Sequence, residues 1–253
     1  MGIYKKLKNF YKKYQGEKGV IGFSEKSRPL YYFCVKKSDF PVVIVQYAIH
    51  AREYITTLLA LKQIKHFERV GKKGCVYFIP AVNPDGIYIC EKHNPLYKAN
   101  ANGVDLNVNF DAKWGTGKNN VFIKSASDFV GECPFSEAET RALRAFTLLK
   151  QPKSTISYHS KGEEIYWEFF QTGKRRNKDK RLAELLSKET GYKLKSTPFS
   201  AGGYKDWCIE KLLISAFTIE VGKDKYCHPL NKSKLKQIYK KNKNVIKVIT
   251  ENV

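Results

Sequence analysis

The chain has 253 residues, a formal net charge of +22 and 42% hydrophobic residues. This length suits one large domain with its own core, and no repeat or low-complexity segment divides it, so we expect a single domain over residues 1–253. No stretch is apolar enough to span a membrane, and membrane insertion is therefore not expected.

The positive charge comes mostly from lysines, which are scattered but cluster at residues 174–181 and 232–247. Such lysines are typical of a solvated surface, and we favour this interpretation over attraction to nucleic acid or another anionic polymer. The charged N-terminus lacks an apolar signal core, which indicates a cytoplasmic protein, with export or spore association left open. The six cysteines show no paired spacing and are then expected to be reduced.

The first two-thirds of the chain predict alternating strands and helices. Residues 29–36, 42–48 and 75–82 are apolar and β-rich, and residues 56–69 carry apolar side chains at helical spacing. Residues 83–134 show little periodicity, and a stretch of that length inside a compact domain is usually functional. Within it, Asn83-Pro-Asp-Gly86 predicts a turn. After it, Ser136-Glu-Ala-Glu139 has the capping-box pattern that opens a helix.

The rest of the chain continues this alternation. The predicted strands are residues 154–159, 164–170 and 216–221, and the predicted helices are residues 178–190, 204–213 and 232–249, the last one basic and amphipathic. The pattern predicts an α/β fold with a central mixed, mostly parallel sheet flanked by helices. Sites in such sheets lie at strand ends, and His50, His159 and Glu220 each lie at or near one.

These strand-end residues have the chemistry of a metal site. His50 and His159 supply imidazoles and Glu53 supplies a carboxylate, a ligand set that holds zinc and leaves a fourth position for water. Glu220 is then a candidate base, and the set indicates a zinc hydrolase. Each histidine alone is better explained as an ordinary buried residue, and Glu220 alone as a strand-end carboxylate bonded to the backbone; only the combination favours the metal.

The motifs, taken in order, resemble the zinc carboxypeptidase-like peptidases. His50-Ala-Arg-Glu53 matches the family's HxxE pair, Ser157-Tyr-His159-Ser160 its third ligand, and Thr218-Ile-Glu220 its late glutamate. Two loop signatures are matched by Asn83-Pro-Asp-Gly86 and by residues 103–110. The matches run in family order from about residue 28 to residue 222, and this ordered set is specific although each match alone is weak.

The resemblance implies a function for each matched residue. One zinc ion is expected to bind His50, Glu53 and His159, and Glu220 is expected to take a proton from the zinc-activated water and deliver it to the leaving amine. Asp105 resembles the family residue that hydrogen-bonds a ligand histidine.

The family's substrate-binding residues are matched only in part. Arg52 follows the family's HxRE pattern and is expected to bind substrate, with a salt bridge on the cleft rim as an equal alternative. Asn107 is retained, but Val108 stands where the family has an arginine that grips the terminal carboxylate. Residues 98–102 lack the family's oxyanion-stabilising arginine, and Pro198 falls near the place of its mobile tyrosine. A standard C-terminal exopeptidase is therefore disfavoured.

A subgroup fits better. Peptidases that cleave γ-D-glutamyl–diamino-acid bonds in bacterial cell-wall peptides are similar in several segments, namely residues 103–117, 158–167, 200–207 and 217–222. This resemblance implies a substrate such as γ-D-glutamyl–meso-diaminopimelate, which carries additional carboxylates near the scissile bond. We expect Lys205 or Lys161 to pair with one of them, the equal alternative being that both are surface lysines.

The prediction is therefore a single-zinc metallopeptidase that acts on cell-wall peptides and does not bind nucleic acid. One alternative is a metallocarboxypeptidase for ordinary α-peptides, against which Val108 argues. The other is a basic polymer-binding protein with a vestigial metal site, which ranks lower because all three ligands and Glu220 are present. The sequence does not indicate an oligomeric state.

Overall fold

The computed structural model describes residues 2–124, 127–196 and 199–253, so Pro198 lies outside the described residues. Over these residues, eight strands form one sheet in the order β1-β2-β4-β3-β5-β8-β6-β7. The strands are β1 (Lys18–Phe23), β2 (Pro29–Lys36), β3 (Val42–Tyr47), β4 (Cys75–Ile79), β5 (Ser154–His159), β6 (Glu164–Tyr166), β7 (Lys193–Lys195) and β8 (Ser215–Glu220).

The centre of the sheet is parallel. β3 pairs in parallel with β4 on one side and with β5 on the other, and β5 pairs in parallel with β8. β1 and β2 form an antiparallel edge, and β6 runs antiparallel to β8. The predicted mixed, mostly parallel sheet is confirmed. Its central strands read as continuous apolar runs because helices cover both of their faces.

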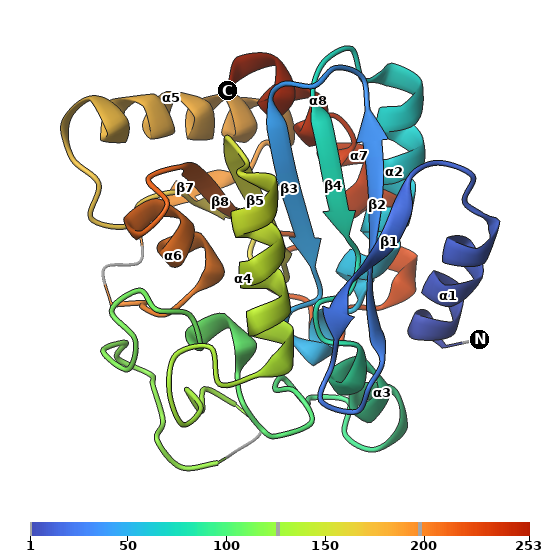
Figure 1. Cartoon of the computed structure of the whole chain (residues 1–253), viewed down its shortest axis with the longest axis vertical. Helices are drawn as coiled ribbons and strands as arrows, with labels where there is room; N and C mark the ends of the chain where they lie inside the picture. Colours follow the sequence, from blue (N-terminus) through green and yellow to red (C-terminus); the bar gives the residue numbers. More distant parts are fainter. Residues whose placement is uncertain (1, 125–126, 197–198) are drawn as a thin grey trace.

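Helices pack on the two faces of the sheet (Figure 1). One face carries α1 (Ile3–Lys13), α2 (Ile55–Val70), α5 (Gly173–Thr190), α7 (Leu235–Asn242) and α8 (Val245–Asn252), and the other carries α4 (Ala138–Lys150) and α6 (Tyr204–Glu210). β3 shows how the sequence divides the two cores. Val43 and Val45 point into the first core and Ile44 into the second, because successive side chains of a strand alternate between faces.

The carboxyl ends of the parallel strands meet at one edge of the sheet, where long loops gather below the arrowheads in Figure 1. The chain leaves β3 and reaches His50 three residues later, while β5 ends at His159 and β8 ends at Glu220. His159 and Glu220 are direct neighbours in the β5–β8 register. The expected position of the site, at the strand ends, is confirmed.

Two local expectations are wrong. Asn83-Pro-Asp-Gly86 does not form a turn but begins α3 (Pro84–Lys92), since the Asn83 side chain accepts a hydrogen bond from the Gly86 N–H at 2.8 Å. Ser136 does not cap α4, which begins after Glu137 without a side-chain cap; the Ser136 hydroxyl instead donates to the Glu137 carboxylate at 2.7 Å.

The chain ends also differ from expectation. The predicted basic helix over residues 232–249 is divided into three pieces. A 3-10 turn, Lys232–Lys234, precedes α7, and Lys243 and Asn244 separate α7 from α8. The elements α1, β1 and β7 were not predicted. α1 is lysine-rich but clearly amphipathic: Ile3 and Leu7 are buried, and Tyr4, Phe10 and Tyr11 pack against the same core at helical spacing.

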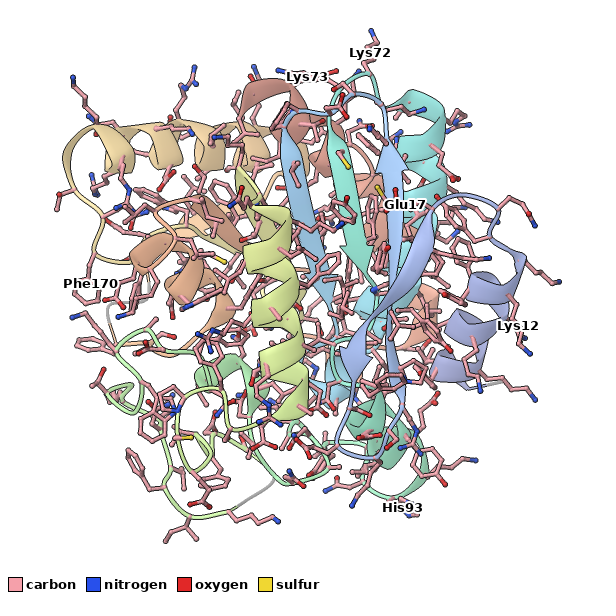
Figure 2. The ribbon with its side chains drawn as sticks, viewed as in Figure 1. Lys12, Glu17, Lys72, Lys73, His93 and Phe170 are labelled. Atoms are coloured by element: carbon pink, nitrogen blue, oxygen red, sulfur yellow. The ribbon has the colours of Figure 1, made fainter. Side chains whose placement is uncertain are left out.

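The charge is carried on the surface. Lys12, Lys72 and Lys73 extend away from the body of the molecule (Figure 2). Among the described residues no helix has both the length and the apolarity needed to cross a bilayer. The cysteines are free thiols, and the sulfur atoms of Cys34 and Cys75 lie 3.5 Å apart across β2 and β4.

A buried polar network ties the sheet to the helices behind the site. The Gln63 amide of α2 accepts from the Tyr47 hydroxyl at 2.7 Å and donates to the Tyr158 hydroxyl at 2.9 Å and to the Asn242 carbonyl at 2.7 Å. The rings of Tyr47 and Tyr158 stack with centroids 5.0 Å apart. One amide thus joins β3, β5 and α7 below the strand ends that carry the site.

Replacing Gln63 with leucine keeps the volume but leaves the hydroxyl of Tyr47 and the carbonyl of Asn242 buried without this partner. We expect the free energy of unfolding to fall by about 2–4 kcal/mol, measured by urea denaturation at constant zinc. Gln15→Leu is the matched control, because the Gln15 side chain is exposed and its amide donates to the neighbouring Lys13 carbonyl. Equal stability of the two variants would contradict a structural role for the network.

Candidate metal centre

The first two ligand candidates lie on a tight turn that follows β3. The Val82 N–H donates to the Tyr47 carbonyl at 3.0 Å, and the Asn83 N–H donates to the Ala48 carbonyl at 3.1 Å. These two bonds continue the hydrogen bonding between the β3 and β4 segments past the end of β4. The chain then enters a 3-10 turn, Ala51–Glu53. This turn brings residues three apart onto one side, so that His50 and Glu53 face each other.

The structure brings the three predicted ligands together. Nδ1 of His50 lies 2.8 Å from Oε1 of Glu53, and Nδ1 of His159 lies 3.1 Å from Oε2 of Glu53 and 3.2 Å from Nδ1 of His50. All three side chains are buried, and their ligand atoms lie within 4.8 Å of one another. Zinc bonds of about 2.0–2.2 Å put tetrahedral ligands roughly 3.4 Å apart, and this donor set therefore fits a zinc ion.

The charges of this cluster also fit a bound cation. Burial of His50 favours its neutral ring, but the carboxylates of Glu53 and Asp105 outweigh burial and raise its pKa to about 9. Burial likewise opposes ionisation of Glu53, yet the two histidines lower its pKa well below the usual range. Burial lowers the pKa of His159. Glu53 is thus an ionised carboxylate next to two ring nitrogens.

A chain of charged groups fixes the orientation of His50. Oδ1 of Asp105 lies 3.1 Å from Nε2 of His50, and Oδ2 lies 2.6 Å from Nζ of Lys98, which also contacts Oδ1 of Asp128 at 2.8 Å. Burial opposes the charge of Asp105, but Lys98 and His50 hold its pKa far below the usual range. With Nε2 engaged by Asp105, Nδ1 is the nitrogen directed at Glu53 and His159.

Two residues support the site without having been assigned a role from sequence. The Asn83 side-chain amide donates to the Ile49 carbonyl at 3.1 Å and to the Ala99 carbonyl at 3.0 Å, and so holds the segments before His50 and after Lys98 together. The Lys98 carbonyl accepts from the Ala51 N–H at 2.9 Å. The only sequence signal for Asn83 is its place in the Asn-Pro-Asp-Gly motif.

Glu220 is the strand-end carboxylate beside this cluster. Its Oε2 atom is buried without a hydrogen-bond partner among the described residues. Burial, together with the negative charge of Glu53, raises the pKa of Glu220 well above the usual range in the metal-free site. A carboxyl group with a free oxygen and a raised pKa can both accept and donate a proton.

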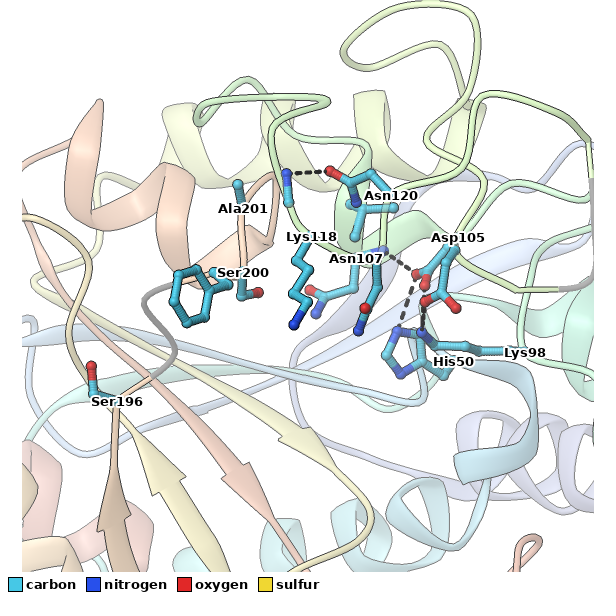
Figure 3. A pocket seen from close by; sticks show the side chains of 14 residues that line it. His50, Lys98, Asp105, Asn107, Lys118, Asn120, Ser196, Ser200 and Ala201 are labelled. Atoms are coloured by element: carbon cyan, nitrogen blue, oxygen red, sulfur yellow. Dashed lines mark hydrogen bonds and ion pairs between the residues drawn. The ribbon is translucent and has the colours of Figure 1, made fainter.

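The cluster opens onto a cavity of about 530 Å³, shown in Figure 3. His50, Lys98, Asp105 and Asn107 form one wall, and Lys118 and Asn120 extend from a loop on the other side. Val108 also lines the cavity, in the place where the family has an arginine. The backbone N–H of Lys118 donates to the Phe199 carbonyl at 3.0 Å, so two loops far apart in sequence meet here.

The other predicted substrate-binding residues separate into different environments. Lys205 is buried and lines a second cavity together with Asn107 and Glu220. Lys161 instead lies against Asp224, with Nζ 2.8 Å from Oδ1. The Arg52 guanidinium contacts the Leu96 carbonyl at 3.5 Å. Of the two lysine candidates, only Lys205 shares a cavity with Glu220.

Removal of one ligand should remove the metal. We expect wild-type protein to hold one zinc ion per chain after dialysis, and His159→Ala to lose most of it, because two protein ligands remain of three. Elemental analysis measures the stoichiometry. The melting temperature should fall on chelation in the wild type but not in His159→Ala, since a ligand that binds the native state stabilises it. His93→Ala, outside the cluster, is the control and should keep its zinc; zinc retention by His159→Ala would contradict the assignment.

Comparison with known proteins supports this site. Residues 3–245 match the zinc carboxypeptidase family. The chain is 29% identical over 276 residues to γ-D-glutamyl-L-diamino acid endopeptidase 1 of Lysinibacillus sphaericus, covering 94% of this chain and 68% of the relative. More generally, it spans 60 to 68% of the length of the first curated relatives that it matches.

Solved structures share the fold. Bovine thrombin-activatable fibrinolysis inhibitor, in complex with tick carboxypeptidase inhibitor, aligns with a TM-score of 0.86 at 24% identity, over 99% of this chain and 96% of that one. Murein-tripeptide amidase MpaA from Escherichia coli O157 aligns with a TM-score of 0.70 at 22% identity, over 92% and 93%. With an extended sequence match, a common fold and a zinc-binding ligand set, this chain belongs to the zinc carboxypeptidase family of metallopeptidases.

Proposed function

We propose that this chain hydrolyses the amide bond between γ-D-glutamate and a diamino acid, meso-diaminopimelate or a close analogue, in bacterial cell-wall peptides. The observation that carries the proposal is the distribution of charge around the metal centre. Lysines 98, 118 and 205 line the two cavities that adjoin His50 and Glu220, while Val108 replaces the arginine that would hold a single terminal carboxylate. A substrate with several carboxylates around the scissile bond suits this distribution.

The relatives point the same way. The Lysinibacillus sphaericus relative, which is 29% identical over nearly the whole of this chain, is named as a γ-D-glutamyl-L-diamino acid endopeptidase. The alternative, a carboxypeptidase acting on ordinary α-peptides, is disfavoured because Val108 cannot form the ion pair that such a substrate needs. A nucleic-acid-binding function has no support from the cavities, where carboxylates stand among the lysines.

The residues of the chain divide the reaction between them. His50, Glu53 and His159 would hold a zinc ion, which would supply a Lewis acid for the scissile carbonyl and for the attacking water. Glu220 accepts the proton of the attacking water on its free oxygen and passes it to the departing amine. Asp105 keeps the His50 ring oriented. Asn107 and Arg52 are proposed to hold the substrate beside these groups.

Lys98 is proposed to stabilise the negative charge that develops on the carbonyl oxygen. Its ammonium lines the same cavity as His50 and is held by Asp105 and Asp128. Burial opposes the charge of Lys98, but the two aspartates raise its pKa further, so it stays a cation at neutral pH. A cation fixed in this way needs no reorganisation during the reaction. Lys98 thus takes the role of the arginine that the sequence lacks.

The reaction is tested with L-Ala-γ-D-Glu-meso-diaminopimelate and zinc-loaded protein, followed by mass spectrometry. The wild type should release free diaminopimelate, and Glu220→Gln should lower kcat by about 10³-fold or more while keeping its zinc, because the proton acceptor is gone. A panel of blocked α-dipeptides runs alongside. An intact tripeptide with cleaved α-dipeptides would replace the proposal with the carboxypeptidase alternative.

The role of Lys98 is tested separately. Lys98→Met should lower kcat by about 10²-fold, the usual effect of losing one oxyanion-stabilising group. Lys98→Arg is the matched control, since it keeps the cation, and should retain most of the activity. Zinc content is measured for both, because Lys98 also contacts Asp105. Unchanged kcat in Lys98→Met would refute this role.

A further inference from the structure

Lysines that are scattered along the sequence gather on one helical layer of the folded chain. The helices α1, α2 and α7 together carry eleven lysines and arginines and, over their fully described length, one carboxylate, that of Glu68. On the opposite face of the sheet, α4 and α6 carry four such cations against three carboxylates. The positive charge of the helices is therefore concentrated on one side of the molecule.

Helical spacing aligns these cations on the solvent side of each helix. Lys5, Lys8 and Lys12 form a stripe along α1, because residues three or four positions apart lie on the same side of a helix. Ile3 and Leu7 of the same helix are buried in the core. The other two helices have equivalent stripes, formed by Lys62, Lys65 and Arg69 on α2 and by Lys236 and Lys240 on α7. All eight side chains are exposed, and we call these eight residues the basic face.

Contacts between the helices join the three stripes into one surface. The helices pack their apolar sides into the same core, so their opposite sides share one face of the molecule. The Lys65 ammonium group of α2 lies 5.6 Å from the centroid of the Phe10 ring of α1. The Lys62 ammonium group lies 5.3 Å from the centroid of the Tyr239 ring of α7. These cation–π contacts hold a cation at each border of α2 and leave its positive charge in place.

The basic face differs from other lysine-rich parts of the chain in having no counter-charges. On α5, Lys180 pairs with Glu184, and on α7 the lysine outside the basic face, Lys241, pairs with Glu163. Among the described residues, none of the eight cations of the basic face forms an ion pair with a carboxylate. Unpaired like charges on one face produce a positive potential that attracts an anionic partner.

The residue types on the basic face restrict the kind of partner. Seven of the eight cations are lysines, whose compact ammonium groups attract anions without the fixed geometry by which arginine recognises the phosphates of nucleic acids. The three helices, all of whose residues are described, expose no large apolar side chain that could stack on bases or insert into a bilayer. A broad layer of anionic headgroups, held by charge alone, fits this distribution best.

We propose that the basic face attaches the protein peripherally to an anionic phospholipid bilayer. The described residues that line the cavity beside His50 come from the loops at the strand ends, and none of them belongs to α1, α2 or α7. Attachment through the basic face therefore leaves the entrance of the metal site open to substrate. The inference does not depend on which bond the metal site cleaves.

Sedimentation with lipid vesicles tests the attachment. At about 50 mM salt, we expect zinc-loaded protein to sediment with phosphatidylcholine vesicles that contain about 30% phosphatidylglycerol, and to stay in solution with pure phosphatidylcholine. Raising the salt to about 0.5 M should release the protein, because salt screens the attraction between exposed charges. Failure to sediment with the anionic vesicles, or equal sedimentation with neutral ones, would overturn the proposal.

A combined variant removes four cations from the basic face: Lys8→Gln, Lys12→Gln, Lys236→Gln and Lys240→Gln. We expect its partition coefficient onto the anionic vesicles to fall by about 10²-fold or more, since each lysine near an anionic surface contributes about fivefold. The substituted side chains are exposed, so the melting temperature and zinc content should match those of the wild type.

The matched control removes four exposed lysines outside the basic face: Lys92→Gln, Lys113→Gln, Lys124→Gln and Lys211→Gln. It has the same net charge as the first variant and should bind the vesicles nearly as well as the wild type. An equal loss of binding in both variants would show that attraction follows net charge alone, which contradicts a dedicated face.

Competition with duplex DNA distinguishes a bilayer from an anionic polymer. DNA is added to vesicle-bound protein at an equal concentration of phosphate groups, and the protein left on the vesicles is measured by sedimentation. We expect most of the protein to stay on the vesicles. Transfer of the protein to the DNA would replace the proposal with a nucleic-acid-binding face.

Discussion

The parallel pairing of β3, β5 and β8 is the constraint on which the site depends. Its register places His159 and Glu220 side by side and brings the turn after β3 within hydrogen-bond distance of His159. The last backbone N–H and C=O groups of parallel strands lack a hydrogen-bond partner on the neighbouring strand. At this edge, loops and side chains from distant segments lie next to these groups. The two cores pack on either side of the sheet behind this edge, and Asp105, Lys98 and Asn83 hold the His50 segment in place.

Buried side chains of alternating charge extend outward from that edge of the sheet. Glu53 lies between two imidazoles, Asp105 lies between His50 and Lys98, and Lys98 lies between Asp105 and Asp128. Each of these buried charges thus has a partner of opposite sign, which is the condition under which ions are tolerated in a protein interior. Glu220 differs from them, because its Oε2 atom has no partner among the described residues and is available for proton transfer.

The Lys205–Asp206 pair follows the same rule in the recess that Asn107 and Glu220 also line, and the pair is neutral as a whole. Asn107 borders both cavities and Gly202 lets the two loops approach. The metal site and the recess are therefore parts of one continuous surface, built from segments that are almost one hundred residues apart.

The sequence alone determined the sheet class and the metal ligands. Apolar runs identify β3, β5 and β8, and the order of His50, Glu53, His159 and Glu220 is specific because few other chemistries require it. Local patterns were less informative where tertiary contacts compete with them: Asn83 caps a helix and holds the Ile49 carbonyl instead of forming a turn. The lysine-rich α1 was overlooked although Ile3, Leu7 and Phe10 recur at helical spacing, because its high charge hides the apolar face that packs on the core.

Only the tertiary structure decided the surroundings of the ligands. Lys98 and Asp105 are near in sequence, but Asp128, His50 and the cavity that they share come together only after folding. The sequence could not distinguish between Lys161 and Lys205 as substrate-binding residues. In the structure Lys161 lies against Asp224, whereas Lys205 is buried beside Asp206. The order of the motifs along the sequence therefore identifies the metal ligands. The ion-pair partner of a buried charge cannot be identified in this way, because it comes from a distant segment that packs against the charge only in the folded protein.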